Sequence, residues 1–223
     1  MAKTSKVTGP TTYVKPLTIN EKEAVRDAIS DWRDDGVQMV DAEAELIVQH
    51  WVDQMTEGRD AYFANMGGEH EHHLEDGKMT WWYECIFLKS DDTCIGVNVG
   101  RFDGLHYIHS FIAIRPAYRN QGYHKEVSEF TIKTLFTVIQ NCESCKVSIP
   151  TDGGDLNSAQ IALWKTDASW NNTTGKTKTL LDRVKPVEYQ YNTITKSDYL
   201  TWLNLPANAA IKNAAYTYEV IDI

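Results

Sequence analysis

The sequence has little of what a membrane-spanning, disulfide-stabilised or secreted protein needs. No apolar run approaches the roughly 20 residues that cross a bilayer, and the first ten residues lack the apolar stretch of a secretory signal. Four cysteines among 223 residues are too few for a disulfide framework. These absences predict a soluble, cytoplasmic protein that neither crosses nor binds a membrane.

Positive charge is also scarce. The chain has 22 Lys and Arg against 31 Asp and Glu, which gives a formal net charge of -9. Affinity for a nucleic-acid backbone comes largely from basic residues that release counterions, so we expect no nucleic-acid partner. An acidic surface attracts cations instead. It favours a polyamine, an aminoglycoside-like molecule or a lysine-bearing peptide as ligand.

The length of 223 residues, of which 42% are hydrophobic, suits one domain with additions. Residues 1–12 are small and polar and predict a flexible N-terminal lead-in. Residues 13–203 form the expected domain. Residues 204–223 are a C-terminal extension with the pattern of an added strand.

A short strand and two amphipathic helices are predicted first. Pro16 confines the strand at Tyr13–Thr18 to a sheet edge or to a strand start, because proline cannot donate to a ladder. Asn20 and Asp41 are the candidate N-caps of the two helices, since each directly precedes a run with helical apolar spacing.

Three strand-like segments follow. They are Trp81–Leu88, Thr93–Phe102 and Leu105–Ile114. In the second, apolar residues alternate with small or polar ones, which is the period of a half-buried strand. Short connections that contain aspartate predict antiparallel neighbours.

The remaining pattern alternates helices and strands. It predicts a helix over Tyr123–Gln140, a strand at Lys146–Ile149, a helix from Asp155 or Asn157, a mobile polar loop over 167–178, a strand at Glu188–Thr195, a helix capped by Ser197 or Asp198, and a last strand at Tyr216–Ile223. The fold class is therefore α+β, with a mixed, mostly antiparallel central sheet flanked by helices.

The stretch from Phe111 to His124 carries the most chemical information. An apolar strand runs through Pro116 into a short loop, and Gly122 directly precedes a helix. Free backbone N–H groups at a helix N-terminus bind anions. Gly122 would let the backbone approach a phosphate closely, and Arg119 would add a charged donor. The alternative is a purely structural strand–turn–helix.

The hexapeptide Arg119-Asn120-Gln121-Gly122-Tyr123-His124 resembles the central motif of the GNAT superfamily of acyl-CoA-dependent N-acetyltransferases. In that motif an apolar strand and a proline precede R/Q-x-x-G-x-G/A, which opens a helix. Ile114 and Pro116 stand at the matching upstream positions. The element order is also similar, and residues 157–165 resemble the second motif of the family. The resemblance covers roughly residues 13–203.

The resemblance implies a GNAT-like sheet and the transfer of an acetyl or short acyl group from acetyl-CoA to an amine by direct attack. It implies no metal, a small-molecule or peptide amine as acceptor, and a homodimer paired through late strands. The residues it places against CoA are Ile112, Ala113, Ile114, Arg119, Asn120, Gln121, Gly122, Tyr123, His124 and Asn157.

The catalytic candidates are His109, Ser110 and Glu84. His109 and Ser110 stand near the end of the motif strand, where the family often carries a carboxylate. Imidazole titrates near neutral pH, so His109 is a candidate general base. Glu84, on a strand across the expected gap, is a rival base. His109 can instead be a hydrogen-bonded strand residue, and Glu84 can instead be a strand residue that faces solvent.

Two departures from the family pattern keep another hypothesis open. Trp164 stands where the family commonly has a tyrosine that protonates the leaving thiolate, and His124 replaces the last small residue of the motif. A catalytically inactive GNAT-like binding or structural module is therefore the alternative function.

Two further patterns invite a metal or redox interpretation. His70-Glu71-His72-His73 resembles a metal cluster and motivates a third hypothesis, a metal- or thiol-dependent hydrolase, although a solvated loop explains the pattern equally. Cys142 and Cys145 have C-x-x-C spacing, but no second pair completes a zinc site. We interpret these cysteines as incidental residues of a helix-to-strand connection.

Overall fold

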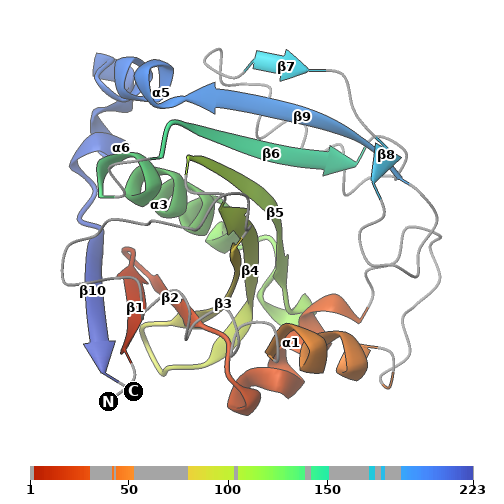
Figure 1. Cartoon of the computed structure of the whole chain (residues 1–223). Coiled ribbons are helices and arrows are strands. Elements are labelled where there is room, and N and C mark those ends of the chain that lie inside the picture. The colour runs from red at the N-terminus through yellow and green to blue at the C-terminus, as the bar shows by residue number, and fades with distance from the viewer. Residues whose placement is uncertain are drawn as a thin grey trace.

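A single sheet forms the centre of the computed structural model (Figure 1). The structure describes residues 3–30, 42, 44–52, 80–102, 105–138, 142–150, 171–173, 177–178 and 187–222. Across the sheet the strand order is β10-β1-β2-β3-β4-β5-β6-β9-β7, and β8 pairs with β9. Among these strands only β5 and β6 pair in parallel. The expected α+β fold with a mostly antiparallel sheet flanked by helices is confirmed.

The strands are β1 (Lys3–Thr8), β2 (Thr12–Pro16), β3 (Thr80–Leu88), β4 (Cys94–Phe102), β5 (His106–Ile114), β6 (Ser144–Pro150), β7 (Asn171–Thr173), β8 (Thr177–Lys178), β9 (Val187–Thr195) and β10 (Thr217–Asp222). The α-helices are α1 (Lys22–Ile29), α3 (Tyr123–Thr137), α5 (Lys196–Leu203) and α6 (Ala209–Asn213). Short 3-10 helices are η1 (Ile19–Glu21), η2 (Pro116–Tyr118) and η3 (Pro206–Asn208). Residues 44–52 are also helical.

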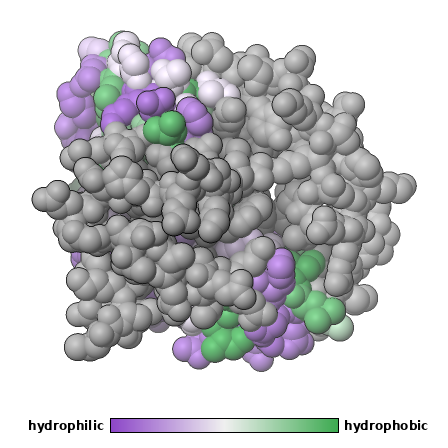
Figure 2. Space-filling model, in the orientation of Figure 1, coloured by the Kyte–Doolittle hydropathy of each residue, from purple (hydrophilic) through white to green (hydrophobic). Residues whose placement is uncertain are grey.

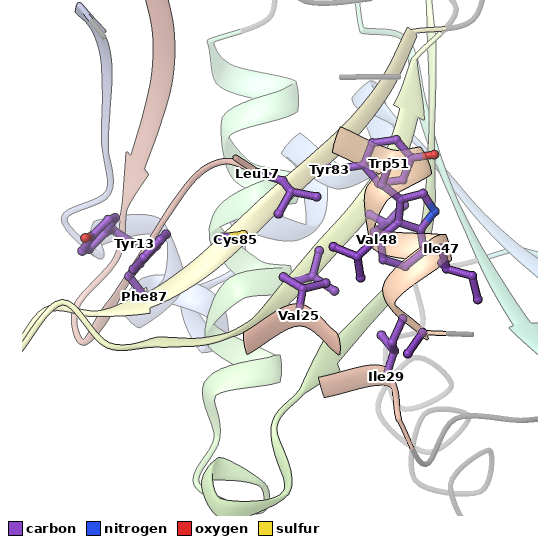
Figure 3. Packing of buried hydrophobic residues seen from close by; sticks show 13 residues of the cluster. Tyr13, Leu17, Val25, Ile29, Ile47, Val48, Trp51, Tyr83, Cys85 and Phe87 are labelled. Carbon is purple, nitrogen blue, oxygen red and sulfur yellow. The ribbon is translucent and has the colours of Figure 1, made fainter. Parts of the chain in front are cut away.

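Helix α1 and the helical residues 44–52 cover one face of the sheet (Figure 3). Val25 and Ile29 of α1 pack with Trp51 against the apolar side chains that β3 directs to this face. Trp51 stacks on Tyr83 with ring centroids 5.2 Å apart. This packing explains the helical spacing of the apolar residues in this part of the sequence.

Helix α3 covers the opposite face. Its Val127 and Phe130 pack on Ile86, Ile112 and Ile114, and all five are buried. Successive strand residues point to opposite faces. Both faces of β3, β4 and β5 are therefore covered, and these strands form the buried centre of the molecule.

The predicted lead-in is wrong for residues 3–8, because they form β1. This strand pairs with β10 along its whole length, from Lys3 opposite Asp222 to Thr8 opposite Thr217. Its one apolar residue, Val7, is buried. A strand with a single apolar residue has almost no local signal, and its partner lies at the other end of the sequence. The expected last strand is present as β10.

Helix caps and loops also differ from expectation. Thr18 rather than Asn20 caps the first helical turn, in a capping box with Glu21, and Thr195 caps α5 in place of Ser197 or Asp198. Ser, Thr and Asn all cap helices well, so the residue that becomes the N-cap depends on where the preceding strand ends. Within the expected mobile loop over 167–178, β7 and β8 pair with β9.

Pro16 occupies the last position of β2 rather than a sheet edge or a strand start. It stands opposite Glu84 of β3, while β1 pairs with β2 only at Tyr13 and Val14. The side of β2 that faces β1 is therefore unpaired at the proline. This explains why a residue without an N–H is tolerated inside the sheet.

Both ends of the chain fasten helix α3. The Glu126 carboxylate accepts hydrogen bonds from the backbone amides of Thr11 and Thr12, at 2.9 and 2.8 Å, and from both threonine hydroxyls. Lys133 Nζ donates to the carbonyls of Ile211, Lys212 and Ala214 at 2.7–3.0 Å. The β1–β2 turn and the segment before β10 are thus both anchored to α3.

Polar and apolar residues are mixed on the described part of the surface. Figure 2 shows hydrophilic residues interspersed with hydrophobic ones on the described part of one face. The exposed large apolar side chains Ile19, Leu46, Leu105 and Leu205 belong to four separate segments. No helix within the described residues has the length and apolarity needed to cross a bilayer.

Replacing Glu126 tests the attachment of the β1–β2 turn to α3. We expect Glu126→Gln to lower the free energy of unfolding by about 1–3 kcal/mol, because an amide replaces one of the charged oxygens that accept these bonds. Chemical denaturation measures the change. Glu143→Gln is the matched control, since Glu143 is exposed and bonds Leu105 and Lys196 through its backbone N–H and carbonyl. Equal stabilities of the two variants would contradict the prediction.

Candidate functional site

Strands β5 and β6 separate after a short common stretch. They pair in parallel only from His106 opposite Ser144 to His109 opposite Val147. Beyond that point β5 continues along β4 to Ile114, and β6 continues along β9 to Pro150. No described strand therefore pairs with the β6-facing edge of residues 110–114. We call this divergence the splay.

A β-bulge lies where the splay begins. Val99 stands opposite Phe111 and Gly100 stands opposite His109, so Ser110 has no partner in β4. A bulge bends a strand and turns its side chains to new directions. The bulge thus helps β5 leave β6 at this point.

The loop after β5 presents a helix N-terminus beside the splay. Pro116 ends the strand and opens η2, and Asn120 and Gly122 adopt left-handed conformations with φ of 61° and 85°. Gly122 is the N-cap of α3. The first amides of a helix have no acceptor within the helix, and no described atom lies within 4 Å of a Cβ built on Gly122. The amides at the start of α3 therefore border open space, as an anion site requires.

Arg119 has a different task from the one expected. Its Nε donates to the Ile114 carbonyl at 2.7 Å, and a terminal nitrogen donates to the Ala28 carbonyl at 3.4 Å. The side chain therefore holds the loop against β5 and the end of α1. Arg115 assists, because it donates to the Cys94 carbonyl and pairs with Asp27 at 3.4 Å. The guanidinium groups of Arg115 and Arg119 thus fix the conformation of the loop that contains Gly122.

The structure brings most of the expected CoA-contacting residues together. Ile112, Ala113 and Ile114 lie on the part of β5 beyond the splay, and residues 119–124 connect it to α3. The side chains of Ile112 and Ile114 point into the core under α3. Only their backbone groups can meet a ligand at the strand edge. Asn157 lies outside the described residues.

Two of the three catalytic candidates lie buried on the same face of the sheet. Glu84 is 7% exposed and His109 is 2% exposed, and both face helix α3. Ser110 is placed by its backbone at the bulge. The expectation that Glu84 can be a solvent-facing strand residue is therefore wrong, because α3 covers its face of β3.

Burial changes the acid–base properties of these groups. Desolvation raises the pKa of Glu84 to about 7, while a hydrogen bond from Asn98 opposes the rise. Desolvation, together with a smaller effect of the nearby His124, lowers the pKa of His109 to about 3. Desolvation also lowers the pKa of the half-buried His124 to about 4. At neutral pH both imidazoles are therefore uncharged, and Glu84 is the group that titrates.

Sequence reasoning missed three polar residues around Glu84. Asn98 of β4 donates to Glu84, Thr131 of α3 lies 3.4 Å from the same Asn98 nitrogen, and Tyr107 of β5 is also buried. The alternation in β4 placed Asn98 on the polar side of a half-buried strand. The apolar stripe of α3 in the sequence could have corrected this expectation. It predicts a second helix on the sheet, and such a helix buries the polar side of β4 as well.

The other sequence patterns give no site within the described residues. No group of three or more His, Cys, Asp or Glu side chains there is arranged to hold a metal ion. The histidine-rich segment at 70–73 and Trp164 lie outside the described residues. Cys142 and Cys145 form no disulfide with another described residue, and both are buried in an apolar cluster with Leu135 and Ile194, as packing residues rather than a metal or redox pair would be.

Comparison with solved structures identifies the fold. Neither a protein-family model nor a curated protein sequence matches the chain. A GNAT-family acetyltransferase from Bacillus anthracis is 15% identical, with a TM-score of 0.56 over 86% of this chain and 99% of that one. A putative ribosomal-protein-serine acetyltransferase from Vibrio cholerae is 15% identical, with a TM-score of 0.58 over 85% and 97%. A GCN5-related N-acetyltransferase from Brucella melitensis is 10% identical, with a TM-score of 0.59 over 93% and 83%.

At these identities the likeness concerns the fold alone. The chain has the GNAT acetyltransferase fold in a divergent form, which confirms the resemblance found in the sequence. The splay and the glycine-capped helix described above are features of this chain's own structure.

The raised pKa of Glu84 predicts a pH-dependent stability. The folded state binds the Glu84 proton more tightly than the unfolded state, so this stabilisation is present below pH 4.5 and is lost as pH rises through about 7. Glu84→Gln removes this dependence. We expect the stability of the variant relative to wild type to rise by about 2–3 kcal/mol from pH 5 to pH 8.

Denaturant titration at both pH values measures this difference. Glu143→Gln, on an exposed loop residue, is the control for the same substitution. A stability difference between wild type and Glu84→Gln that stays constant from pH 5 to pH 8 would show that Glu84 does not titrate in this range.

Proposed function

We propose that the chain is an N-acyltransferase that moves an acetyl or short acyl group from acetyl-CoA to an amine. The observation that carries the proposal is the edge of β5 beyond the splay, with which no described strand pairs and which leads directly to a glycine-capped helix N-terminus. A ligand with an extended arm and phosphates at one end fits this arrangement, because the arm can lie along the strand edge while the phosphates meet the helix N-terminus. The GNAT fold supports the same assignment.

The ligand would use mostly backbone groups of this chain. Backbone groups on the β6-facing edge of residues 110–113 would bond the extended arm in the manner of an added strand, while the Ile114 carbonyl already accepts a bond from Arg119. The amides that follow Gly122 would hold the phosphates, and the positive end of the α3 dipole would favour their charge. His124 is uncharged near neutral pH, so its part would be contact rather than charge.

The bound acetyl-CoA supplies an activated thioester, and the chain's task is to position the amine against it. Direct attack needs an unprotonated amine, hence a proton acceptor. Glu84 and His109 are the described candidates, and Ser110 lies at the bulge beside the thioester end of the expected path. A buried carboxyl group with a pKa near 7 supports a catalytic role over the alternative of an inactive binding module.

The acceptor would be a cationic amine, small or within a peptide, because the net charge of -9 attracts cations. The homodimer and the cytoplasmic location belong to the same proposal. Both rest on the sequence and on the family resemblance.

Calorimetric titration with acetyl-CoA and with free CoA tests the proposal. We expect micromolar binding to wild-type protein. Arg119→Ala should weaken it about tenfold or more, because the loop loses its attachment to β5 and α1. Gly122→Trp should weaken it more, because a side chain there is strained at φ 85° and fills the open space above the helix.

A surface tryptophan far from the site is the matched control. Thr201→Trp places the same side chain at an exposed position of α5 and should leave the affinity unchanged. Circular dichroism verifies that each variant is folded. No binding by wild-type protein up to millimolar ligand would overturn the proposal.

A further inference from the structure

Two thiols meet on the face of the sheet that α1 covers. Cys85 of β3 is fully buried, and Cys94, the first residue of β4, is partly exposed. Both belong to the apolar cluster that packs against α1, in which Figure 3 labels Cys85. Neither residue takes part in the candidate site. The reactivity of a cysteine, more than its packing, usually decides its use in a protein.

The strand register makes the two cysteines neighbours. Cys94 stands opposite Phe87, which is two residues from Cys85 in β3. A β-bulge at this point leaves Ile95 without a partner in β3. Because residues i and i+2 of a strand point to the same face, the side chains of Cys85 and Cys94 are diagonal neighbours across the β3–β4 pair.

The Cys94 side chain leans toward Cys85. Its Sγ lies 3.7 Å from the Gly96 carbonyl oxygen. The Ile95 carbonyl bonds the Arg115 amide on the β5 side, so the next carbonyl, that of Gly96, points to β3. The Cys94 sulfur is therefore on the β3 side of β4. There the Cys85 thiol donates a hydrogen bond to it.

The surroundings of Cys94 favour its thiolate form. The hydrogen bond from Cys85 lowers the pKa of the Cys94 thiol, and the positive charge of Arg115 acts in the same direction, whereas burial and Glu21 oppose the change. Desolvation raises the pKa of the Cys85 thiol. The thiolate is the nucleophile in thiol chemistry. Cys94 is therefore the attacking group, and Cys85 keeps its proton.

Cys94 is also attached to the loop that opens α3. Arg115 Nη1 donates to the Cys94 carbonyl at 3.1 Å, and the Arg115 amide donates to the Ile95 carbonyl at 2.8 Å. Arg115 is the N-cap of η2, and the loop continues from there to Gly122 at the start of α3. The first residues of β4 thus hold the first residue of the loop.

A bond between the two sulfurs requires β4 to move. Diagonal neighbours across two strands lie about 7–8 Å apart, whereas the Cα atoms of a disulfide usually lie about 4.4–6.8 Å apart. Closing the bond therefore draws Cys94 toward β3. The two carbonyls that Arg115 holds belong to this stretch of β4, so the movement lengthens their bonds to Arg115.

We propose that Cys94 and Cys85 are a peroxide-responsive thiol pair, which closes to a disulfide and thereby loosens the loop between Arg115 and Gly122. The oxidant is a small hydroperoxide, since Cys94 is only partly exposed. The modification itself does not depend on the proposed acyltransferase function. Its effect on acetyl-CoA binding rests on that function.

The reaction balances in two steps. The Cys94 thiolate attacks one oxygen of hydrogen peroxide, an S–O bond forms, the O–O bond breaks, and hydroxide leaves. Cys94 is then a sulfenic acid. The Cys85 sulfur attacks the Cys94 sulfur, the S–S bond forms, the S–O bond breaks, and the departing hydroxide takes the Cys85 proton to give water. The two thiols lose two electrons to the peroxide, and a small dithiol reverses the change.

Peptide mapping after treatment with hydrogen peroxide tests the modification. Trypsin separates Cys85 from Cys94, in peptides 79–89 and 90–101. We expect the two peptides to be joined in oxidised wild-type protein and separate after reduction with dithiothreitol. In Cys85→Ala the second step is blocked, so dimedone, which labels sulfenic acids, should add to peptide 90–101. The wild-type map alone decides the link, so this test does not depend on the folding of a variant.

Hydrogen exchange and calorimetry test the effect on the loop. We expect the amides of residues 115–122 to exchange faster in oxidised protein, because the loop opens more readily. The affinity for acetyl-CoA should fall about fivefold or more. By linkage, saturating acetyl-CoA should shift the thiol–disulfide equilibrium in a dithiol buffer toward the thiols by the same factor.

Two variants are compared with wild type. Cys94→Ala should show none of these changes. Cys145→Ala is the matched control, because Cys145 is buried in another apolar cluster, and the variant should respond to peroxide as wild type does.

The outcomes separate the thiol pair from the proposed function. Unlinked peptides in oxidised wild-type protein, or a link formed by Cys145 instead, would overturn the inference. A link between Cys85 and Cys94 that leaves loop exchange and acetyl-CoA affinity unchanged would overturn the effect on the loop. If wild-type protein binds no acetyl-CoA but the link forms and loop exchange rises, the acyltransferase proposal fails and the thiol pair stands.

Discussion

Burial of helix α3 against the sheet is the interaction on which the rest of the structure depends. The helix connects β5 to β6, and a connection of this kind makes the two strands parallel neighbours. Its buried residues Val127 and Phe130 pack on Ile112 and Ile114, so the helix lies along β5. The packing therefore sets its N-terminus beside the splay. One helix thus fixes the position of the loop at Gly122, lies beside the edge of β5 beyond the splay, and covers the buried polar residues Glu84, Asn98 and His109.

The apolar packing of α3 also offsets the free-energy cost of burying the polar side chains beneath it. Glu84, Asn98 and His109 are almost completely removed from water, which disfavours the charged forms of the two titratable groups. The apolar clusters on either side keep the helix in place over them. A stable interface thereby holds a carboxyl group whose pKa lies near neutrality, a combination that a solvent-exposed site would not maintain.

The two chain ends complete this arrangement. β1 and β10 pair with each other, and their neighbouring segments bond to Glu126 and Lys133 of α3. The helix is thus attached to both terminal segments as well as packed on the central strands. In Figure 1 the N- and C-termini lie together beside these strands. The terminal segments, which look like additions in the sequence, are structural supports of the helix that opens the candidate site.

The sequence by itself determined β3, β4 and β5 to within one residue and the start of α3 at Tyr123, because apolar alternation, Pro116 and Gly122 act locally. It also determined the GNAT fold, since the loop motif and the element order are linear features. Only the tertiary structure decided that residues 3–8 form a strand, because their partner lies over 200 positions away. Only the tertiary structure shows that Asn98 and Glu84 are buried and that Arg119 donates to the Ile114 carbonyl. Burial and bonding at these residues depend on which helix covers which face, and no local pattern contains that information.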